Sequence, residues 1–277
     1  MKVIVADQAG VCFGVKRALN LVNAEAEKCE GLATLGPLIH NPQVVQDLEQ
    51  KGVRVVKSVG DVQCGVIVMP SHGVPRDVMK AAENAGLKIV DAACPFVENV
   101  HCKVETLAAE GYMVVVVGDA GHSEVKAIKN AAGENSVVIS SLEDAQSVDW
   151  SGKKVGIVSQ TTQTPERFGE VVGLIASQAK EVVAYNTICY ATHDRQSAAR
   201  ELAPQVEAMF VVGGRNSANT NRLAEICRES GVPTYHIETS SEIQPDWVNG
   251  METVGLTAGA STPEWIIEEV KKRLEEL

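Results

Sequence analysis

The segment KIVDAACPFVENVHCKVETLA, residues 88–108, predicts a strand that leads through a short turn into a helix. Ile89 and Val90 are apolar and form the end of the predicted strand, and small residues then lead to Cys94. Pro95 occupies the expected first helical position, where the missing N–H of proline has no intrahelical partner to lose. Taken alone, a thiol at this place is more often a structural cysteine, because a buried cysteine packs as a small hydrophobic residue.

Two further segments have the same order of strand, Asp or Asn, short turn, cysteine and helix. VIVADQAGVCFGVKRALNLV (3–22) contains Cys12, and VVAYNTICYATHDRQSAARELA (182–203) contains Cys189. The spacings are 82 residues from 12 to 94 and 95 residues from 94 to 189.

A second motif repeats in step with the cysteines. A strand ends in Gly, a polar residue follows four positions later, and a helix begins, in TLGPLIHNPQVVQDL (34–48), VVGDAGHSEVKAI (116–128) and VVGGRNSANTNRLAEI (211–226). The polar residues are His40, His122 and Ser217, again 82 and 95 residues apart. Equal spacings at two independent motifs indicate a threefold internal repeat.

The third motif is a strand, a small polar turn and a proline at the predicted start of a helix. It occurs in VIVMPSHGVPRDVMKAA (66–82), VGIVSQTTQTPERFGEVV (155–172) and VGLTAGASTPEWIIEEV (254–270). The prolines are Pro75, Pro165 and Pro263, and Thr164 and Thr262 are predicted N-caps.

Each repeat contains one more short apolar strand, within 53–56, 137–139 and 233–237. Four strands alternating with helices predict an α/β fold with parallel sheets. The last repeat lacks its fourth strand, and VIVAD opens the chain as a spare one, so residues 1–12 are expected to complete the third domain. We predict three pseudo-equivalent small domains in a trilobed arrangement around a pseudo-threefold axis: 13–96, 97–191, and 192–277 completed by 1–12.

The repeated turns are expected to form one functional site, because ligands of parallel α/β sheets bind outside the carboxyl ends of the strands. If the three domains face one axis, Cys12, Cys94 and Cys189 meet there. Three thiolates could bind zinc with one open position, or an iron–sulfur cluster with one iron lacking a protein ligand, or be structural. The other four cysteines have no repeat counterpart and are predicted to be structural: Cys29, Cys64, Cys102 and Cys227.

The remaining polar residues at these strand ends predict an anion site. They are His40, His72, His122, Thr161, Thr162, Ser217, Asn219 and Ser261. Helix N-termini at the same turns offer N–H donors and partial positive charge, so a phosphorylated ligand is expected. Three histidines have no such repeat support and are predicted to be non-catalytic: His101, His193 and His236.

Glu124, two residues after His122, is the one acid in this set. A glutamate at a helix start can simply complement the helix dipole. It is also the natural proton source in a site of donors, and a neighbouring polyanion should raise its pKa as like charges do.

The bulk composition excludes several classes of protein. A net charge of −11 and a pI near 5.1 argue against nonspecific binding to nucleic acid or to an anionic membrane. No apolar run approaches the length of a membrane span, and the start MKVIVADQAG is too soon polar for a signal peptide. A cytoplasmic protein with its seven cysteines as thiols is expected.

The whole chain resembles the LytB/IspH family of 4-hydroxy-3-methylbut-2-enyl diphosphate reductases. The matching segments are AGVCFGVKRAL, GPLIHNPQVV, SHGVP, DAACPFV, GHSEV, QTT, TICYAT, NSANTNRL and AGASTP. Ala218 departs from the resemblance where many members have a second Ser, and His193–Asp194 stand where Thr-Asn is frequent.

The resemblance implies a trilobed iron–sulfur oxidoreductase. A 4Fe-4S cluster would be held by Cys12, Cys94 and Cys189, and its open iron would take the substrate hydroxyl. Residues implied in substrate binding are His40, His72, His122, Thr161, Ser217, Asn219 and Ser261. Glu124 and Thr161 would deliver protons.

The implied reaction uses two electrons and two protons to remove the allylic hydroxyl as water, giving isopentenyl and dimethylallyl diphosphate. This is the last step of non-mevalonate isoprenoid biosynthesis, and the electron donor would be a ferredoxin or flavodoxin. Two alternatives predict other metal contents. A zinc-dependent hydrolase of a phosphorylated small molecule would contain zinc alone. A non-catalytic diphosphate-binding protein would keep its ligand affinity when the cysteines are replaced.

Overall fold

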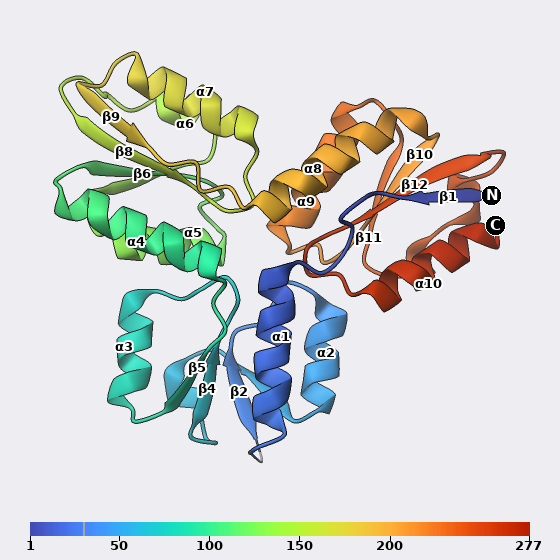
Figure 1. Cartoon of the computed structure of the whole chain (residues 1–277), viewed down its shortest axis with the longest axis horizontal. Coiled ribbons are helices and arrows are strands. Elements are labelled where there is room, and N and C mark those ends of the chain that lie inside the picture. Colours follow the sequence, from blue (N-terminus) through green and yellow to red (C-terminus); the bar gives the residue numbers. More distant parts are fainter. Residues whose placement is uncertain (30) are drawn as a thin grey trace. The chain divides into compact units, whose positions relative to one another are not determined.

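The computed structural model describes residues 1–29 and 31–277, whose strands form three separate four-stranded parallel sheets (Figure 1). Sheet A contains, in spatial order, β11 (Thr234–Ile237), β10 (Ala208–Val212), β12 (Thr253–Ala258) and β1 (Lys2–Val5). Sheet B contains β3 (Val53–Val56), β2 (Leu32–Leu35), β4 (Val66–Met69) and β5 (Lys88–Asp91). Sheet C contains β7 (Ser136–Ile139), β6 (Met113–Val117), β8 (Lys154–Ser159) and β9 (Glu181–Ala184).

Helices alternate with these strands along the chain. They are α1 (Phe13–Ala26), α2 (Pro42–Gln50), α3 (Arg76–Asn84), α4 (Pro95–Ala109), α5 (Ser123–Ala132), α6 (Leu142–Gln146), α7 (Pro165–Ala176), α8 (Tyr190–Leu202), α9 (Ala218–Glu229) and α10 (Glu264–Glu275). Short 3-10 turns cover Val59–Asp61, Ala203–Gln205, Ser240–Glu242 and Pro245–Trp247. The predicted fold class, three parallel-sheet α/β units, is confirmed.

The three sheets share one topology, which explains where the repeated motifs lie. In each sheet the chain runs from the second position to the first and then crosses to the third, and in sheets B and C it continues to the fourth. β1 takes the fourth position of sheet A, parallel to β12, with Lys2 opposite Thr253. The chain order therefore reverses between β2 and β4, β6 and β8, and β10 and β12, and such switch points are where open α/β sheets bind ligands.

The central strands are buried on both faces, as parallel sheets covered by helices require. All of Val114–Val117 in β6 and Met209–Val212 in β10 are inaccessible to solvent. Separate apolar clusters form on the two sides of sheet A, one including Phe210 and Leu256 and the other Met209 and Val211. Rigid strands therefore hold the turns at their carboxyl ends.

The helix starts follow the predicted turn chemistry only in part, since Pro75 is the N-cap of α3 and not its first residue. Pro95 and Pro165 are the first residues of α4 and α7, and the Thr164 hydroxyl accepts the Arg167 N–H at 3.3 Å. Thr262, in contrast, is not an N-cap, because Pro263 holds that position and the Thr262 hydroxyl donates to the Val212 carbonyl at 2.9 Å. The hydroxyl instead ties the turn after β12 to the end of β10.

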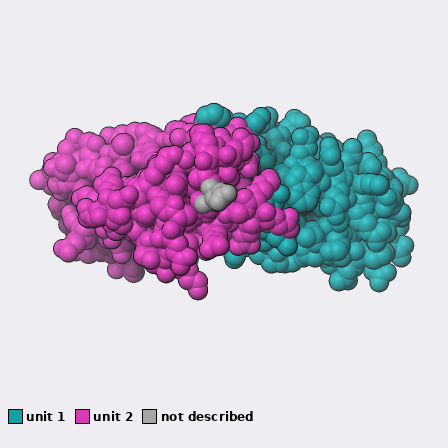
Figure 2. All heavy atoms as spheres, turned by 90° about the horizontal axis from the view of Figure 1, so that it is seen from below, with its two compact units in different colours: residues 1–16, 39–47, 190–277 teal, residues 17–38, 48–189 magenta. Residues whose placement is uncertain are grey.

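The chain divides into two compact units (Figure 2). Unit 1 comprises residues 1–16, 39–47 and 190–277 and contains sheet A. Unit 2 comprises residues 17–38 and 48–189 and contains sheets B and C. The domain boundaries 13–96, 97–191 and 192–277 with 1–12 stay a prediction. Within the described residues, no helix combines the length and the hydrophobicity that a membrane crossing requires.

Candidate functional site

Each of the three repeated cysteines makes an equivalent backbone hydrogen bond. The backbone N–H of Cys94 donates to the Ser71 carbonyl at 2.9 Å, and that of Cys189 donates to the Thr161 carbonyl at 3.0 Å. In unit 1 the Cys12 N–H donates to the Ala260 carbonyl at 3.1 Å. Each accepting carbonyl belongs to the turn after the third strand of its sheet, which is β4, β8 or β12. The repeat therefore places three thiols at equivalent positions, each beside a switch point.

These thiols have the chemistry expected of metal ligands. Cys94 is the N-cap of α4, while Cys12 and Cys189 directly precede α1 and α8, and all three are partly buried. A helix N-terminus favours the thiolate over the thiol. No disulfide joins any of the seven cysteines, all of which lie in the described residues. Thiolates of this kind are ligands of iron–sulfur clusters and of zinc. Within the described residues, no three His, Cys, Asp or Glu side chains are grouped so that they could hold a metal ion.

The other four cysteines lack this arrangement. The thiol of Cys29 donates to the Glu25 carbonyl and that of Cys64 to the Val66 carbonyl, both at 3.3 Å. Cys102 is exposed on α4, and burial raises the pKa of Cys227 to about 12. None of the four lies at the carboxyl end of a strand beside a repeated turn.

A buried acid lies at the switch point of sheet C. Glu124 is the second residue of α5, and its side chain is bound by Thr161, the second residue after β8. The Thr161 N–H donates to Glu124 Oε1 at 2.6 Å, and the Thr161 hydroxyl donates to Oε2 at 2.8 Å. Glu124 is only 3% exposed and Thr161 6%. The carboxyl group is thus fixed in orientation and separated from bulk water.

Burial raises the pKa of Glu124 to about 7, against the two hydrogen bonds from Thr161, which favour the carboxylate. The nearby charge of Asp119 also contributes to this raised pKa. A raised pKa was predicted as the effect of a bound polyanion. In the structure, burial raises the pKa of Glu124 without any anion. A carboxyl group with this pKa can both hold and release a proton near neutral pH.

Two further site histidines lie in unit 2. His122 is the N-cap of α5, and its Nδ1 accepts the Glu124 N–H at 3.2 Å. A neutral imidazole that accepts at Nδ1 carries its proton at Nε2. The ring of His72, in the turn after β4, lies at a centroid distance of 6.5 Å from that of His122 in an edge arrangement. The two side chains thus bring the turns of sheets B and C together.

Sequence reasoning missed Gln160, which joins the two turns of sheet C. Its Oε1 accepts the Asp119 N–H at 2.9 Å, and a Cβ on Gly118 would lie 2.8 Å from its side chain. The only signal in the sequence was a polar residue directly between a buried strand and the Thr-Thr pair.

Unit 1 carries the hydroxyl and amide groups. Ser217 is the N-cap of α9, and its Oγ accepts both the Thr220 N–H at 3.3 Å and the Thr220 hydroxyl at 2.9 Å. The Ser217 hydroxyl proton therefore points to neither of these partners. Asn219 follows in the first turn of α9 and is 4% exposed, yet neither amide atom has a hydrogen-bond partner among the described residues. A buried amide without a partner is costly, which indicates that a ligand completes its hydrogen bonds.

His40 and Ser261 lie together in the same unit. The Ser261 hydroxyl donates to the His40 carbonyl at 3.2 Å, and burial lowers the pKa of the His40 imidazole. A Cβ on Gly214 would lie 2.5 Å from the His40 carbonyl oxygen, so only glycine fits beside this backbone. Ala218, the first residue of α9, contributes no hydroxyl.

The predicted site residues therefore form two groups. Unit 2 holds Cys94, Cys189, His72, His122, Glu124 and Thr161, and unit 1 holds Cys12, His40, Ser217, Asn219 and Ser261. His193 is exposed on α8, and His236 Nε2 lies 2.8 Å from the Gly213 carbonyl, where it supports the turn after β10.

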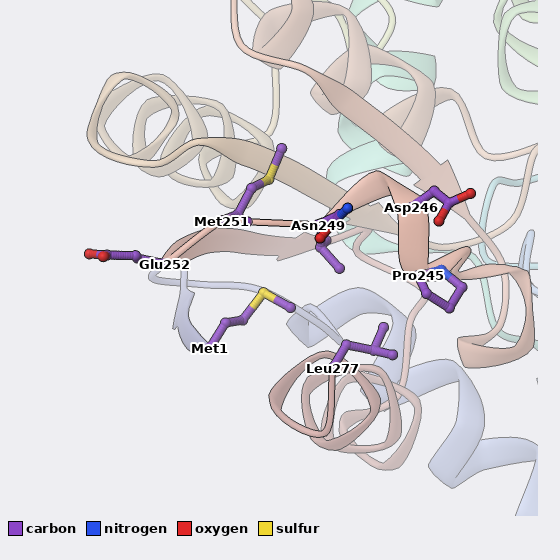
Figure 3. A pocket seen from close by; sticks show the side chains of 9 residues that line it. Met1, Pro245, Asp246, Asn249, Met251, Glu252 and Leu277 are labelled. Atoms are coloured by element: carbon purple, nitrogen blue, oxygen red, sulfur yellow. The ribbon is translucent and has the colours of Figure 1, made fainter.

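A separate open pocket of about 630 Å³ lies in unit 1 at the opposite ends of the strands (Figure 3). Met1, Glu252 and Leu277 line it, so it is next to the amino ends of β1 and β12 and to both chain termini. No cysteine or histidine lines this pocket. None of the residues that line this pocket belongs to the three repeated motifs.

Comparisons with known proteins match the chain over its whole length. The family model described as LytB protein matches residues 3–275. A relative from Trichlorobacter lovleyi, named 4-hydroxy-3-methylbut-2-enyl diphosphate reductase, is 49% identical and covers 100% of this chain and 99% of its own. A relative of the same name from Aquifex aeolicus is 46% identical, with 99% and 96% covered.

Two solved structures are also similar. One, described as the structure of (E)-4-hydroxy-3-methyl-but-2-enyl diphosphate reductase, the terminal enzyme of the non-mevalonate pathway, is 46% identical with a TM-score of 0.70 and 100% coverage of both chains. The other, the E-1-hydroxy-2-methyl-but-2-enyl-4-diphosphate reductase from Plasmodium falciparum, is 26% identical with a TM-score of 0.91, covering 100% of this chain and 87% of that one.

Proposed function

The chain belongs to the LytB family of 4-hydroxy-3-methylbut-2-enyl diphosphate reductases, and we propose that it catalyses the reductive removal of the allylic hydroxyl for which these relatives are named. The family is one of iron–sulfur enzymes. Two electrons and two protons convert the substrate to water and isopentenyl or dimethylallyl diphosphate, the last products of the non-mevalonate pathway. Membership favours this function over a zinc-dependent hydrolase or a non-catalytic diphosphate-binding protein.

Cys12, Cys94 and Cys189 are the proposed ligands of a 4Fe-4S cluster with one open iron. The single observation that supports this assignment is the hydrogen bond from each cysteine N–H to the turn after the third strand of its sheet. The cluster would supply electrons and a Lewis-acidic iron for the leaving hydroxyl, which side chains cannot do. Each cysteine would contribute a thiolate ligand from the start of a helix.

The diphosphate would be bound by hydroxyl, amide and imidazole donors. They are His40, His72, His122, Thr161, Ser217, Asn219 and Ser261. Two observations support this role. The Asn219 amide is buried without a partner, and the Ser217 oxygen already accepts two hydrogen bonds, so its own proton remains to be donated. With its proton on Nε2, His122 is likewise a donor.

Glu124 is the proposed proton source, acting with Thr161. The Thr161 hydroxyl, 2.8 Å from Glu124 Oε2, can accept a proton from the protonated carboxyl and donate its own onward. The raised pKa of Glu124 keeps a large share of the enzyme in the acid form at neutral pH. Burial of the pair excludes bulk water from the transfer. The electrons would come from a ferredoxin or flavodoxin.

The decisive experiment is anaerobic reconstitution of the full chain, with counts of iron and acid-labile sulfide and an assay of turnover. We expect bound iron and sulfide, and loss of both the visible spectrum and turnover in each of Cys12→Ser, Cys94→Ser and Cys189→Ser. Cys102→Ser is the matched control, because it lies on the same helix as Cys94 and should change neither. Zinc without sulfide in the wild type, or a full cluster in Cys189→Ser, would contradict the proposal.

A further inference from the structure

His101 lies directly beneath the turn that carries His72. It is in the second turn of α4, the helix that begins after Cys94, and it is fully buried. Gly73 adopts φ of 74°, and a Cβ added there would lie 3.2 Å from Val97 Cγ1 and 3.5 Å from His101 Cε1. The edge of the imidazole therefore fills the space under the residue that follows His72.

The two ring nitrogens of His101 do not explain its presence by hydrogen bonding. Neither has a hydrogen-bond partner among the described residues, and the Glu98 carboxylate is 3.8 Å from Nδ1, beyond hydrogen-bond distance. Burial lowers the pKa of His101, while the carboxylates of Glu98, Glu105 and Asp91 oppose this and the charge of Arg76 reinforces it. The lowered pKa favours the neutral ring, and the contacts of this ring with the turn are packing contacts.

The same turn is fastened at several other points. Its Ser71 carbonyl accepts the Cys94 N–H, and the Gly73 N–H donates to the Pro70 carbonyl at 3.0 Å. At its far end Arg76 pairs with Glu98 and Glu105 of α4, at 3.3 and 2.8 Å. Beneath the middle of the turn, at Gly73, the His101 ring packs together with Val97.

We propose that His101 is a positioning residue, whose ring holds the His72 turn in the conformation that binds the diphosphate of the substrate. This rests on the proposed role of His72 in diphosphate binding. Because α4 begins at Cys94 and carries His101 under this turn, one rigid helix sets the position of both a cluster ligand and an anion-binding side chain.

The test is the affinity of the cluster-loaded full chain for inorganic diphosphate, together with KM and kcat for the allylic substrate. His101→Ala removes the support, so the diphosphate affinity should fall about tenfold, the effect of weakening one hydrogen bond to a charged group. KM should rise by a similar factor while kcat and the iron content stay within about twofold, since the residue does not touch the reacting atoms. His101→Phe keeps a flat ring in the same space and should restore the affinity.

Val104→Ala is the matched control. Val104 is fully buried one turn further along α4, where it packs in the core against sheet C, so its truncation should lower the melting temperature without changing diphosphate affinity. A wild-type affinity in His101→Ala would overturn the inference, as would an equal loss in His101→Phe and His101→Ala, which would mean that polarity matters and shape does not. If His101→Ala does not fold, His101→Gln replaces it. A smaller loss of diphosphate affinity is then expected, and an unchanged affinity would overturn the inference.

His72→Ala separates this inference from the proposed function. A wild-type affinity for inorganic diphosphate in His72→Ala would remove His72 from the binding site and so refute the premise. A weakened affinity in His72→Ala together with a wild-type affinity in His101→Ala would refute only the positioning role.

Discussion

Glu124 and Asn219 occupy the same place in two repeats and have opposite chemical situations. Each is the second residue of a helix that follows the first strand of its repeat, 95 residues apart, and the two are 3% and 4% exposed. The Glu124 carboxyl accepts two hydrogen bonds from Thr161, while neither amide atom of Asn219 is bonded within the described residues. One side chain is satisfied by the fold, and the other is not.

The difference separates the handling of a proton from the binding of an anion. A carboxyl group that is buried and internally bonded can change its protonation without changing its position. A buried amide without partners presents a donor that only a ligand satisfies. In the first repeat the corresponding residue is Pro42, which offers neither function. The backbone of the repeat is thus constant, and the residue two positions after His40, His122 or Ser217 decides what each turn does.

The largest effect is expected for Glu124→Gln, which keeps the shape of the side chain and removes the transferable proton. Turnover should fall by a factor of about 10² to 10⁴, the usual contribution of a positioned acid. Cluster content and the affinity for substrate should be unchanged, because the carboxyl is not assigned to either. Single-turnover measurements of product, beside iron counts and ligand titration, test this.

A pH profile is the control for this variant. In the wild type kcat should decline above about pH 7 as the acid form of Glu124 is lost, and the residual activity of Glu124→Gln should lack that decline. Wild-type turnover in Glu124→Gln would mean that its carboxyl only complements the helix dipole and that the proton comes from another group.

A smaller effect is expected when the amide is made to resemble the acid. Asn219→Asp places a carboxylate where a diphosphate is proposed to bind, so like charges should weaken the affinity for inorganic diphosphate roughly ten- to a hundredfold. The kcat at saturating substrate should change much less, since Asn219 is not assigned to proton transfer. Asn221→Asp, an exposed position on the same helix, is the matched control and should leave the affinity within about twofold. Equal effects of the two substitutions would assign the loss to general surface charge.

Much of this comparison could be predicted from the sequence, because it depends on spacing. The sequence separations between His122 and Ser217 and between Cys94 and Cys189 are both 95 residues, and this equality identifies the equivalent turns. Parallel topology then placed those turns at the carboxyl ends of strands. The three-unit α/β fold followed from the same repeat and is confirmed.

The internal partners of the site could not be predicted, because they depend on atomic contacts between turns far apart in the chain. Glu124 and Thr161 are 37 residues apart, and no periodicity links them. Thr262 looked like an N-cap by its position before a proline, but its hydroxyl reaches a strand 50 residues away. His101 has no repeat counterpart, so the repeat does not reveal that its ring packs beneath the His72 turn.

A further effect is expected on stability, and its dependence on pH tests the difference between the Glu124 turn and the Asn219 turn. The pKa of Glu124 is raised in the folded state to about 7 from a usual value of 4.5, so the folded protein binds the proton more tightly than the unfolded chain does. The stabilisation this gives is complete below about pH 4.5 and is lost as the pH rises through about 7. Relative to Glu124→Gln, which cannot ionise, the wild type should therefore lose up to roughly 3 kcal/mol between pH 5 and pH 8. In a chain of this size that is a difference of several degrees in melting temperature, measured anaerobically on both proteins at each pH. Asn219→Asp introduces a buried carboxyl at the amide turn, where no threonine bonds it. The melting temperature of this variant relative to the wild type should fall with rising pH. A constant difference between the wild type and Glu124→Gln across this range would show that the Glu124 carboxyl has an ordinary pKa, and the distinction between the acid turn and the amide turn would then rest on hydrogen bonding alone.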